Sequence, residues 1–314
     1  MKFQTYILVF LIFLFSACSA APIPGTDSGG MPGIPTPARP QPTASVPVPT
    51  PTLTPTSQPS LTDTAVSPTA TSTPLHVKPT HTPVPLLIGQ GPSLVVCPIL
   101  LYHHVEIPQT SDPYFIAPDD FRAQMQALKD WGYTTISATQ LVQAINYGAD
   151  LPARPIVISF DDGDESVYTT AFPIMREFGF SGVNYIVVNF IGTQGYMSVD
   201  QLLELASAGW ETGSHSMSHT DLTKSDNIEW EMVESRYQLG RLLHVPINTF
   251  AYPYGRARLD MYDVLMKNYQ AGMGLGISNN QRGRDLWYLW RRPVELGVTL
   301  QTFASYLPWN TPLP

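Results

Sequence analysis

Cysteine is nearly absent from this chain of 314 residues, which contains only Cys18 and Cys97. Cys18 closes the sequence FSAC near the amino terminus. If Cys18 is modified or removed during export, Cys97 is the single remaining thiol and no internal disulfide can form. Cys97 lies among apolar residues in SLVVCPILLY, which favours a buried structural thiol over a nucleophile.

Charge and long apolar runs are also limited. Charged residues make up 13% of the chain, and the formal net charge is −8. This negative balance argues against nucleic acid as a partner. The apolar stretch at 6–15 is shorter than the about 20 residues that span a bilayer, and no second candidate follows it. It has the length of a signal-peptide core.

The first 18 residues resemble a bacterial lipoprotein signal peptide. Lys2 precedes the apolar stretch, and small residues stand immediately before Cys18, as in a lipobox. This pattern predicts that Cys18 becomes the lipidated first residue, which anchors the protein to the cell membrane on its outer side. The alternative is cleavage after Ala20, which would release a secreted protein.

Residues 19–92 form a second region, rich in proline, threonine and serine. No apolar periodicity of a strand or helix is found there. Such a segment buries too little apolar surface to offset its conformational entropy, so we predict a disordered linker. The remaining residues, 93–314, have the length of one folded domain.

This domain alternates short apolar runs with amphipathic segments. Strands are expected within 94–102, 153–160, 182–188 and 248–254, and helices within 117–132, 167–179, 198–209 and 228–243. Alternating strands and helices favour a parallel sheet covered by helices, either an α/β barrel or an open doubly wound sheet. In both architectures, functional residues gather where strands end and loops begin.

Two polar clusters occupy such positions. Asp161 and Asp162 end the run PIVISF and precede Gly163, whose freedom permits a turn that brings both carboxylates to one site. Their mutual repulsion indicates a nearby cation. His215 and His219 follow a predicted helix, and a spacing of four places two imidazoles on one side of a helical turn, as zinc sites require. Together these residues predict a divalent metal centre.

The segments SFDDG, GSHSMSHTDL and FAYPYG, in this order, resemble the first three motifs of NodB-type polysaccharide deacetylases, carbohydrate esterase family 4. The resemblance extends from LLYHHV, near residue 101, to about residue 303. It implies a distorted (β/α) barrel in which a Zn ion, or alternatively Co or Ni, activates water against an acetyl group on a sugar. The opening LLYHHV is similar to the subgroup of poly-N-acetylglucosamine deacetylases.

The resemblance also implies roles for individual residues. Asp161 corresponds to the catalytic base, and Tyr254 to the residue whose backbone N–H stabilises the oxyanion. The metal ligands implied by the motifs are Asp162, His215 and His219.

The sequence departs from the family pattern at two places. Ala251 stands where the family has an arginine beside the base, and Arg291 or Arg292 is expected to supply that charge. The late histidine that acts as general acid is missing, and the resemblance assigns this role to His103.

The expected function is metal-dependent hydrolysis of N-acetyl groups on an N-acetylated polysaccharide outside the membrane. Two alternatives remain at this point: an O-acetyl esterase acting on xylan-like glycans, and a glycan-binding protein that keeps the barrel without turnover.

Overall fold

The computed structural model describes residues 85–108 and 110–313. Cys18, the signal segment and most of the predicted linker lie outside these residues. In the part of the chain that the structure describes, no helix combines the length and apolar character needed to cross a membrane. The description below concerns the domain that these residues form.

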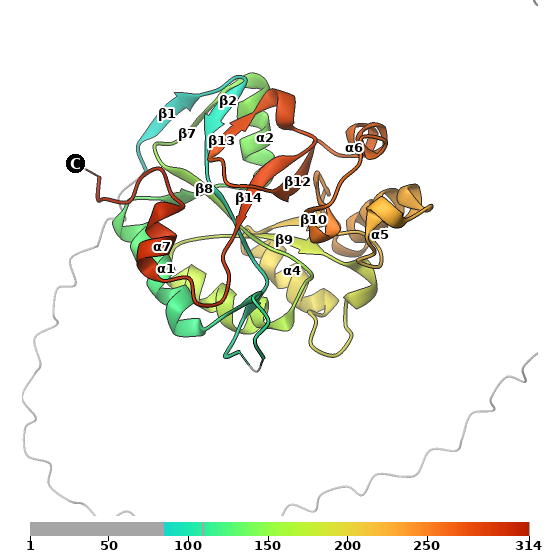
Figure 1. The fold of residues 1–314 in the computed structure, drawn as a ribbon, viewed down its shortest axis with the longest axis horizontal. Coiled ribbons are helices and arrows are strands. Elements are labelled where there is room, and N and C mark those ends of the chain that lie inside the picture. The colour runs from blue at the N-terminus through green and yellow to red at the C-terminus, as the bar shows by residue number, and fades with distance from the viewer. Residues whose placement is uncertain (1–84, 109, 314) are drawn as a thin grey trace, which may run out of the picture. The chain divides into compact units, whose positions relative to one another are not determined.

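Seven parallel strands close into a barrel (Figure 1). They follow one another around the ring in chain order, and β14 pairs with β3 to close it. The strands are β3 (Ile99–Tyr102), β8 (Pro155–Phe160), β9 (Val183–Ile186), β10 (Glu211–Ser214), β11 (Thr249–Ala251), β12 (Ala271–Leu275) and β14 (Leu289–Pro293). The prediction of a (β/α) barrel is therefore confirmed.

The ring is distorted beside β8. The short strand β6 (Thr134–Thr135) pairs with the first residues of β8, and β9 pairs only with its last residues, Ser159 and Phe160. Both neighbours thus share one edge of β8. The barrel is fully paired at this point only near its carboxyl end, which is where the polar clusters of the sequence lie.

Helices cover the outside of the barrel (Figure 1). Two of them begin with a serine whose hydroxyl caps the first turn and a glutamine that returns the hydrogen bond: Ser137 with Gln140, and Ser198 with Gln201. The α-helices are α1 (Pro118–Asp130), α2 (Ala138–Tyr147), α3 (Phe172–Phe178), α4 (Val199–Ser207), α5 (Ser235–Leu243), α6 (Met261–Asn268) and α7 (Leu300–Ser305).

Shorter helical turns complete these helices and the loops. Two π-helical segments, η1 (Val167–Ala171) and η4 (Trp230–Glu234), lead directly into α3 and α5. Single 3₁₀ turns occur at η2 (Val188–Phe190), η3 (Leu222–Lys224), η5 (Pro253–Gly255) and η6 (Gly283–Asp285).

The strands are buried on both faces, as β8 shows. All six of its residues are buried. Ile156, Ile158 and Phe160 pack in the layer between barrel and helices, whereas Val157 packs in a second cluster with Ile99 and other residues of the barrel interior. Because successive side chains of β8 enter two buried layers in turn, the strand is a continuous apolar run in the sequence.

Helix α2 closes the amino-terminal end of the barrel. Its apolar face belongs to the interior cluster. In its first turn, the Thr139 N–H and hydroxyl both donate to Glu211, the first residue of β10, and Asn248, just before β11, donates to the Thr139 hydroxyl. Because this end is filled, the carboxyl end is the one that can hold a functional site.

The folded domain begins earlier than the predicted boundary at residue 93. Strand β1 (Leu87–Gln90) pairs with β7 (Ala149–Pro152), and the Ser93 N–H donates to the Ile145 carbonyl. Main-chain hydrogen bonds thus make part of the folded domain out of residues that composition alone had assigned to the linker. Two further small sheets pair β2 (Leu94–Val96) with β13 (Asn280–Arg282) and β4 (His104–Val105) with β5 (Phe115–Ile116).

Phe160 offers a test of the layer between barrel and helices. Its ring is 1% exposed and stacks on Tyr102 and Trp210, with centroids 5.6 and 5.5 Å away. We expect Phe160→Ala to lower the free energy of unfolding by roughly 3–5 kcal/mol, because it leaves a cavity. Leu259→Ala, at a side chain that is 78% exposed, should change it by less than about 0.5 kcal/mol. Urea denaturation measures both; equal losses would contradict this packing.

Candidate active site

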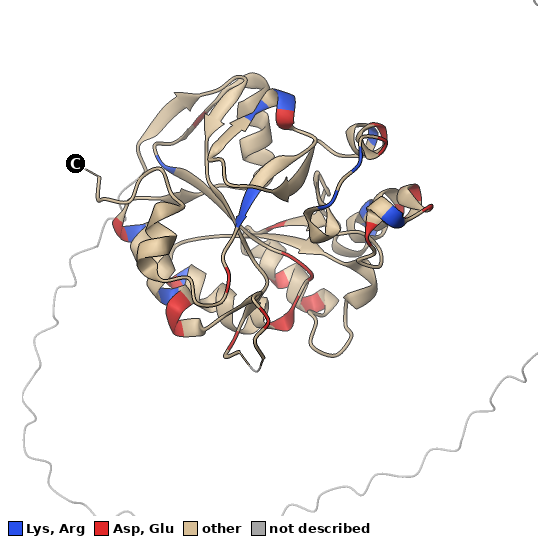
Figure 2. Cartoon of the chain, viewed as in Figure 1, with Lys and Arg blue, Asp and Glu red and all other residues tan. Residues whose placement is uncertain are grey.

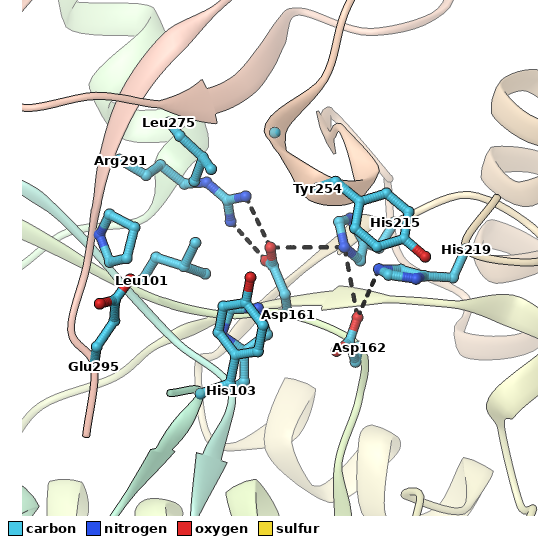
Figure 3. A pocket seen from close by; sticks show the side chains of 13 residues that line it. Leu101, His103, Asp161, Asp162, His215, His219, Tyr254, Leu275, Arg291 and Glu295 are labelled. Carbon is cyan, nitrogen blue, oxygen red and sulfur yellow. Dashed lines mark hydrogen bonds and ion pairs between the residues drawn. The ribbon is translucent and has the colours of Figure 1, made fainter. Parts of the chain in front are cut away.

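A pocket opens at the carboxyl ends of the barrel strands (Figure 3). It brings together segments that are far apart in the sequence. Seven residues singled out by the motifs line it: His103 after β3, Asp161 and Asp162 after β8, His215 and His219 after β10, Tyr254 after β11, and Arg291 within β14.

The backbone turns at the aspartate pair itself. Asp162 has a φ of 72° and Gly163 a φ of 90°, so two successive residues take positive φ. Because Asp162 is not a glycine, its left-handed conformation is strained and needs support from its surroundings. The turn sends the two adjacent carboxylates to different partners.

Asp161 faces a buried arginine inside the barrel. Its two carboxylate oxygens accept from Arg291 Nη1 at 2.6 Å and from Nη2 at 2.8 Å, and Arg291 Nε donates to the Gly274 carbonyl at 3.2 Å. Arg291 is fully buried, and its guanidinium lies 5.2 Å from the centre of the Tyr185 ring. Burial alone would raise the pKa of Asp161, but chiefly the charge of Arg291 outweighs it and lowers the pKa to about 2.

This geometry distinguishes the two candidate arginines. Arg291 contacts Asp161. It thus supplies the positive charge that the family's arginine would provide at the position of Ala251. Arg292 instead donates to the Ile277 carbonyl at 3.2 Å and lies over the Tyr306 ring at 4.6 Å. Neighbouring residues of a strand point to opposite faces, so only one of the pair can reach the barrel interior. Figure 2 shows a basic stretch of β14 near the centre of the view, whereas many of the other charged segments lie on the surrounding helices.

Asp162 faces the two histidines. Its Oδ1 lies 3.2 Å from Nε2 of His219 and 3.5 Å from Nε2 of His215. This oxygen is buried and has no hydrogen-bond partner among the described residues. Buried polar oxygens are almost always paired, so an unpaired one between two imidazole nitrogens fits a position meant for a cation. The three ligand atoms lie within 4.8 Å of one another.

Electrostatics support the same reading of Asp162. Burial, and then the neighbouring charge of Asp161, raise the pKa of Asp162 to about 7. A divalent cation beside the carboxylate would favour its ionised form. The donor set of one carboxylate and two imidazoles is one that binds zinc or a similar ion and leaves positions open for water and substrate.

His215 has the tautomer that a ligand needs. Its Nδ1 lies 2.8 Å from the Ala251 carbonyl, which can only accept, so Nδ1 carries the proton and Nε2 is free to bind a metal. Burial lowers the pKa of His215 to about 3, which keeps the ring neutral. A backbone carbonyl therefore fixes the orientation of this ring.

The spacing of the two histidines comes from a loop and not from the predicted helical turn. The segment after β10 is irregular, and both Ser216 and His219 have positive φ, at 74° and 59°. The Ser216 hydroxyl accepts from the His219 N–H at 2.9 Å. The prediction of a helical turn was wrong because serine side chains here supply local hydrogen bonds that replace helical ones.

His103 also lines the pocket, where it packs against Tyr114 with ring centroids 4.4 Å apart. Burial lowers its pKa to about 4, so the ring is neutral at pH 7. A role as general acid therefore requires that His103 gain its proton during substrate binding or turnover. His104 points elsewhere, to Asp164, with Nδ1 2.9 Å from Oδ2. Asp164 also accepts from the Ser166 N–H in the first helical turn, as a capping residue does.

Tyr254 completes this side of the pocket. It has a φ of 60°, and its ring lies 4.7 Å from the His219 ring. Its side chain is half-exposed at the mouth of the pocket. The oxyanion role of its backbone N–H stays a prediction.

The sequence did not point to several residues of the pocket wall. Tyr114 comes from a loop between two short strands, and Glu295 follows β14. Neither lies in one of the motifs, so only the fold reveals their proximity. Leu101, Gly255, Leu275 and Pro293 form the rest of the wall.

Comparison with known proteins agrees with this geometry. Residues 148–275, which include the aspartates and both histidines, match the sequence model described as polysaccharide deacetylase. The domain belongs to the polysaccharide deacetylase family. Members of this family are hydrolases, and those that act on N-acetyl groups cleave an amide bond.

Individual relatives extend the match. The Bacillus subtilis protein YxkH, named as a candidate polysaccharide deacetylase, is 24% identical over 67% of this chain and 75% of its own length. The poly-beta-1,6-N-acetyl-D-glucosamine N-deacetylase of Staphylococcus aureus is 24% identical over 54% of this chain and 62% of its own. The structure of the polysaccharide deacetylase BC0361 of Bacillus cereus superposes with a TM-score of 0.61 at 26% identity, over 67% of this chain and 68% of that one.

The two aspartates should behave differently when each is changed to asparagine. Asp162→Asn removes a ligand, so we expect Zn²⁺ affinity to fall more than about 100-fold. This loss is larger than that seen when a residue that only supports a ligand is replaced. Asp161→Asn should retain the metal. It should also destabilise the fold by roughly 3–5 kcal/mol, because Arg291 is left buried without its anionic partner. Titration with a competing chelator measures Zn²⁺ affinity, and thermal unfolding measures stability. Loss of Zn²⁺ binding in Asp161→Asn would contradict the assignment of Asp162, and not Asp161, as the metal ligand.

Proposed function

We propose that this polysaccharide deacetylase is a metal-dependent enzyme that removes N-acetyl groups from polymers of N-acetylglucosamine outside the cell membrane. The observation that carries the proposal is the buried Oδ1 of Asp162, unpaired between the nitrogens of His215 and His219. A domain that only bound glycans would have no need for such a site.

Asp162, His215 and His219 would hold the ion. When bound, a divalent metal lowers the pKa of a coordinated water and polarises the acetyl carbonyl. Asp161 adjoins this position, with Oδ2 3.6 Å from His215 Nε2, and is the carboxylate that takes the proton of the attacking water. The two hydrogen bonds from Arg291 fix its orientation and hold it ionised before the reaction.

Two further groups act on the substrate. In this proposal, the backbone N–H of Tyr254 donates to the oxyanion that forms on the acetyl carbonyl oxygen. His103 delivers a proton to the departing sugar nitrogen, since an amine is a poor leaving group until it is protonated. Because its resting pKa is low, His103 receives this proton during the reaction. The source is Asp161, which lines the same pocket, acts on His103 through its charge and holds a proton once water is activated.

An N-acetyl substrate is favoured over an O-acetyl ester for two reasons. His103 lies in the pocket, and an amide requires an acid where an ester needs less assistance. The staphylococcal relative is named for poly-N-acetylglucosamine N-deacetylation. The proposed location outside the membrane rests on the lipobox-like sequence at Cys18, which lies beyond the described residues.

Acetate release tests the activity. The full chain, stripped of metal with a chelator and then dialysed, should release acetate from β-1,6-linked N-acetylglucosamine oligomers only after Zn²⁺ or Co²⁺ is restored. The Asp161→Asn variant, which keeps the metal, should release at least about 100-fold less, the contribution of a general base. Acetylated xylan serves as the comparison substrate. Acetate release from xylan alone would indicate an O-acetyl esterase in place of an N-deacetylase, and release from neither substrate would favour a binding protein.

The role of His103 has its own test. We expect His103→Ala to lower kcat on the oligomers by roughly 100-fold or more, the usual effect of losing a general acid, with Zn²⁺ affinity unchanged. His104→Ala, at the adjacent ring that faces Asp164, serves as the matched control and should keep most of kcat. Wild-type turnover in His103→Ala would remove this residue from the mechanism.

A further inference from the structure

A buried carboxylate outside the motifs contacts the loop that carries the histidines. Glu231 is 4% exposed and lies in the π-helical segment η4, twelve residues after His219. One of its oxygens, Oε2, accepts from the backbone N–H groups of Met217 and Ser218, both at 3.0 Å. The other, Oε1, accepts from the Ser218 hydroxyl at 2.5 Å. Three donors of the loop thus converge on one side chain.

This loop has no regular structure of its own. Two of its five residues, Ser216 and His219, are left-handed without being glycine, and such residues persist only where contacts hold them. Met217 and Ser218, which Glu231 binds, stand between these two residues. The carboxylate therefore fixes the part of the loop that determines where the His219 ring points.

The π-helical segment explains how Glu231 reaches the loop. Wider turns of this kind are frequent at functional sites, because they shift the register of side chains around the helix axis. Ser235, the first residue of α5, contacts the base of the same loop through the Ser214 hydroxyl, at 2.7 Å. The junction of η4 and α5 thus contacts both the strand end that precedes the loop and the middle of the loop.

Charge supplies a second argument. Asp161 and Arg291 form a neutral pair, so they do not balance a cation. Among the ion pairs of residues 85–108 and 110–313, none involves Glu231. Asp162 and Glu231 then contribute two negative charges near the histidines, which matches the two positive charges of a divalent ion.

We propose that Glu231 is a positioning residue of the metal centre, which holds the His215–His219 loop in its ligating conformation and supplies a second buried negative charge for a divalent cation. This inference rests on the metal site of the proposed function. Glu231 touches neither the substrate nor the ion, and it acts through the loop.

Two substitutions separate these contributions. Glu231→Gln keeps an oxygen that can accept from the loop N–H groups but removes the charge, whereas Glu231→Ala removes both. We expect Zn²⁺ dissociation constants about 10-fold higher for the glutamine variant and about 100-fold higher for the alanine variant, the range found for residues that support ligands. A competing chromophoric chelator measures these constants on the full chain, without reference to turnover.

Glu229→Gln is the matched control, since Glu229 is an exposed acid two residues away in the sequence. It should bind Zn²⁺ like the wild type. Thermal unfolding of the metal-free proteins identifies any variant that fails to fold; Ser218→Ala, which loses only the hydroxyl contact, then takes its place and should weaken binding several-fold. Folded Glu231 variants with wild-type Zn²⁺ affinity would overturn the inference. A wild-type chain that binds no metal would instead overturn the proposed function.

Discussion

The left-handed backbone of Asp162 is the constraint on which the site depends. On a regular strand, two adjacent carboxylates would point to opposite faces, and only one would enter the pocket. A φ of 72° at Asp162 lets Asp161 remain inside the barrel while Asp162 turns toward the histidines. Of the six non-glycine residues with positive φ in the described ranges, four lie at this site: Asp162, Ser216, His219 and Tyr254. Strain is thus concentrated where geometry matters for function.

The same turn separates the two carboxylates electrostatically. Asp161, held by Arg291, has a pKa lowered to about 2 and stays ionised throughout the neutral range. Asp162, buried beside that charge, has a pKa raised to about 7 and lacks a cationic partner of its own. Neighbouring groups whose pKa values are pushed apart take different chemical roles. Here one is a base with its own counter-ion, and the other is a ligand that needs a metal.

The pattern of apolar runs indicated a parallel sheet covered by helices, and the resemblance of the local motifs to the family pointed to the barrel and to the residues at its carboxyl end. The sequence pattern missed β10, β12 and β14, which are short or contain glycine or charged residues, so their burial depends on neighbours and not on their own pattern. It could not choose between Arg291 and Arg292, since strand register decides which one points inward. Glu231 lies outside every motif, and its contacts exist only in the folded chain.

Zinc-soaked crystals, with anomalous scattering recorded on both sides of the zinc edge, would test the central claim most directly. The account predicts one strong peak at a distance of about 2.0–2.2 Å from Asp162 and from Nε2 of both His215 and His219, with Asp161 outside bonding distance. A peak ligated by Asp161, a peak at His104 and Asp164 instead, or no peak at saturating zinc would contradict it.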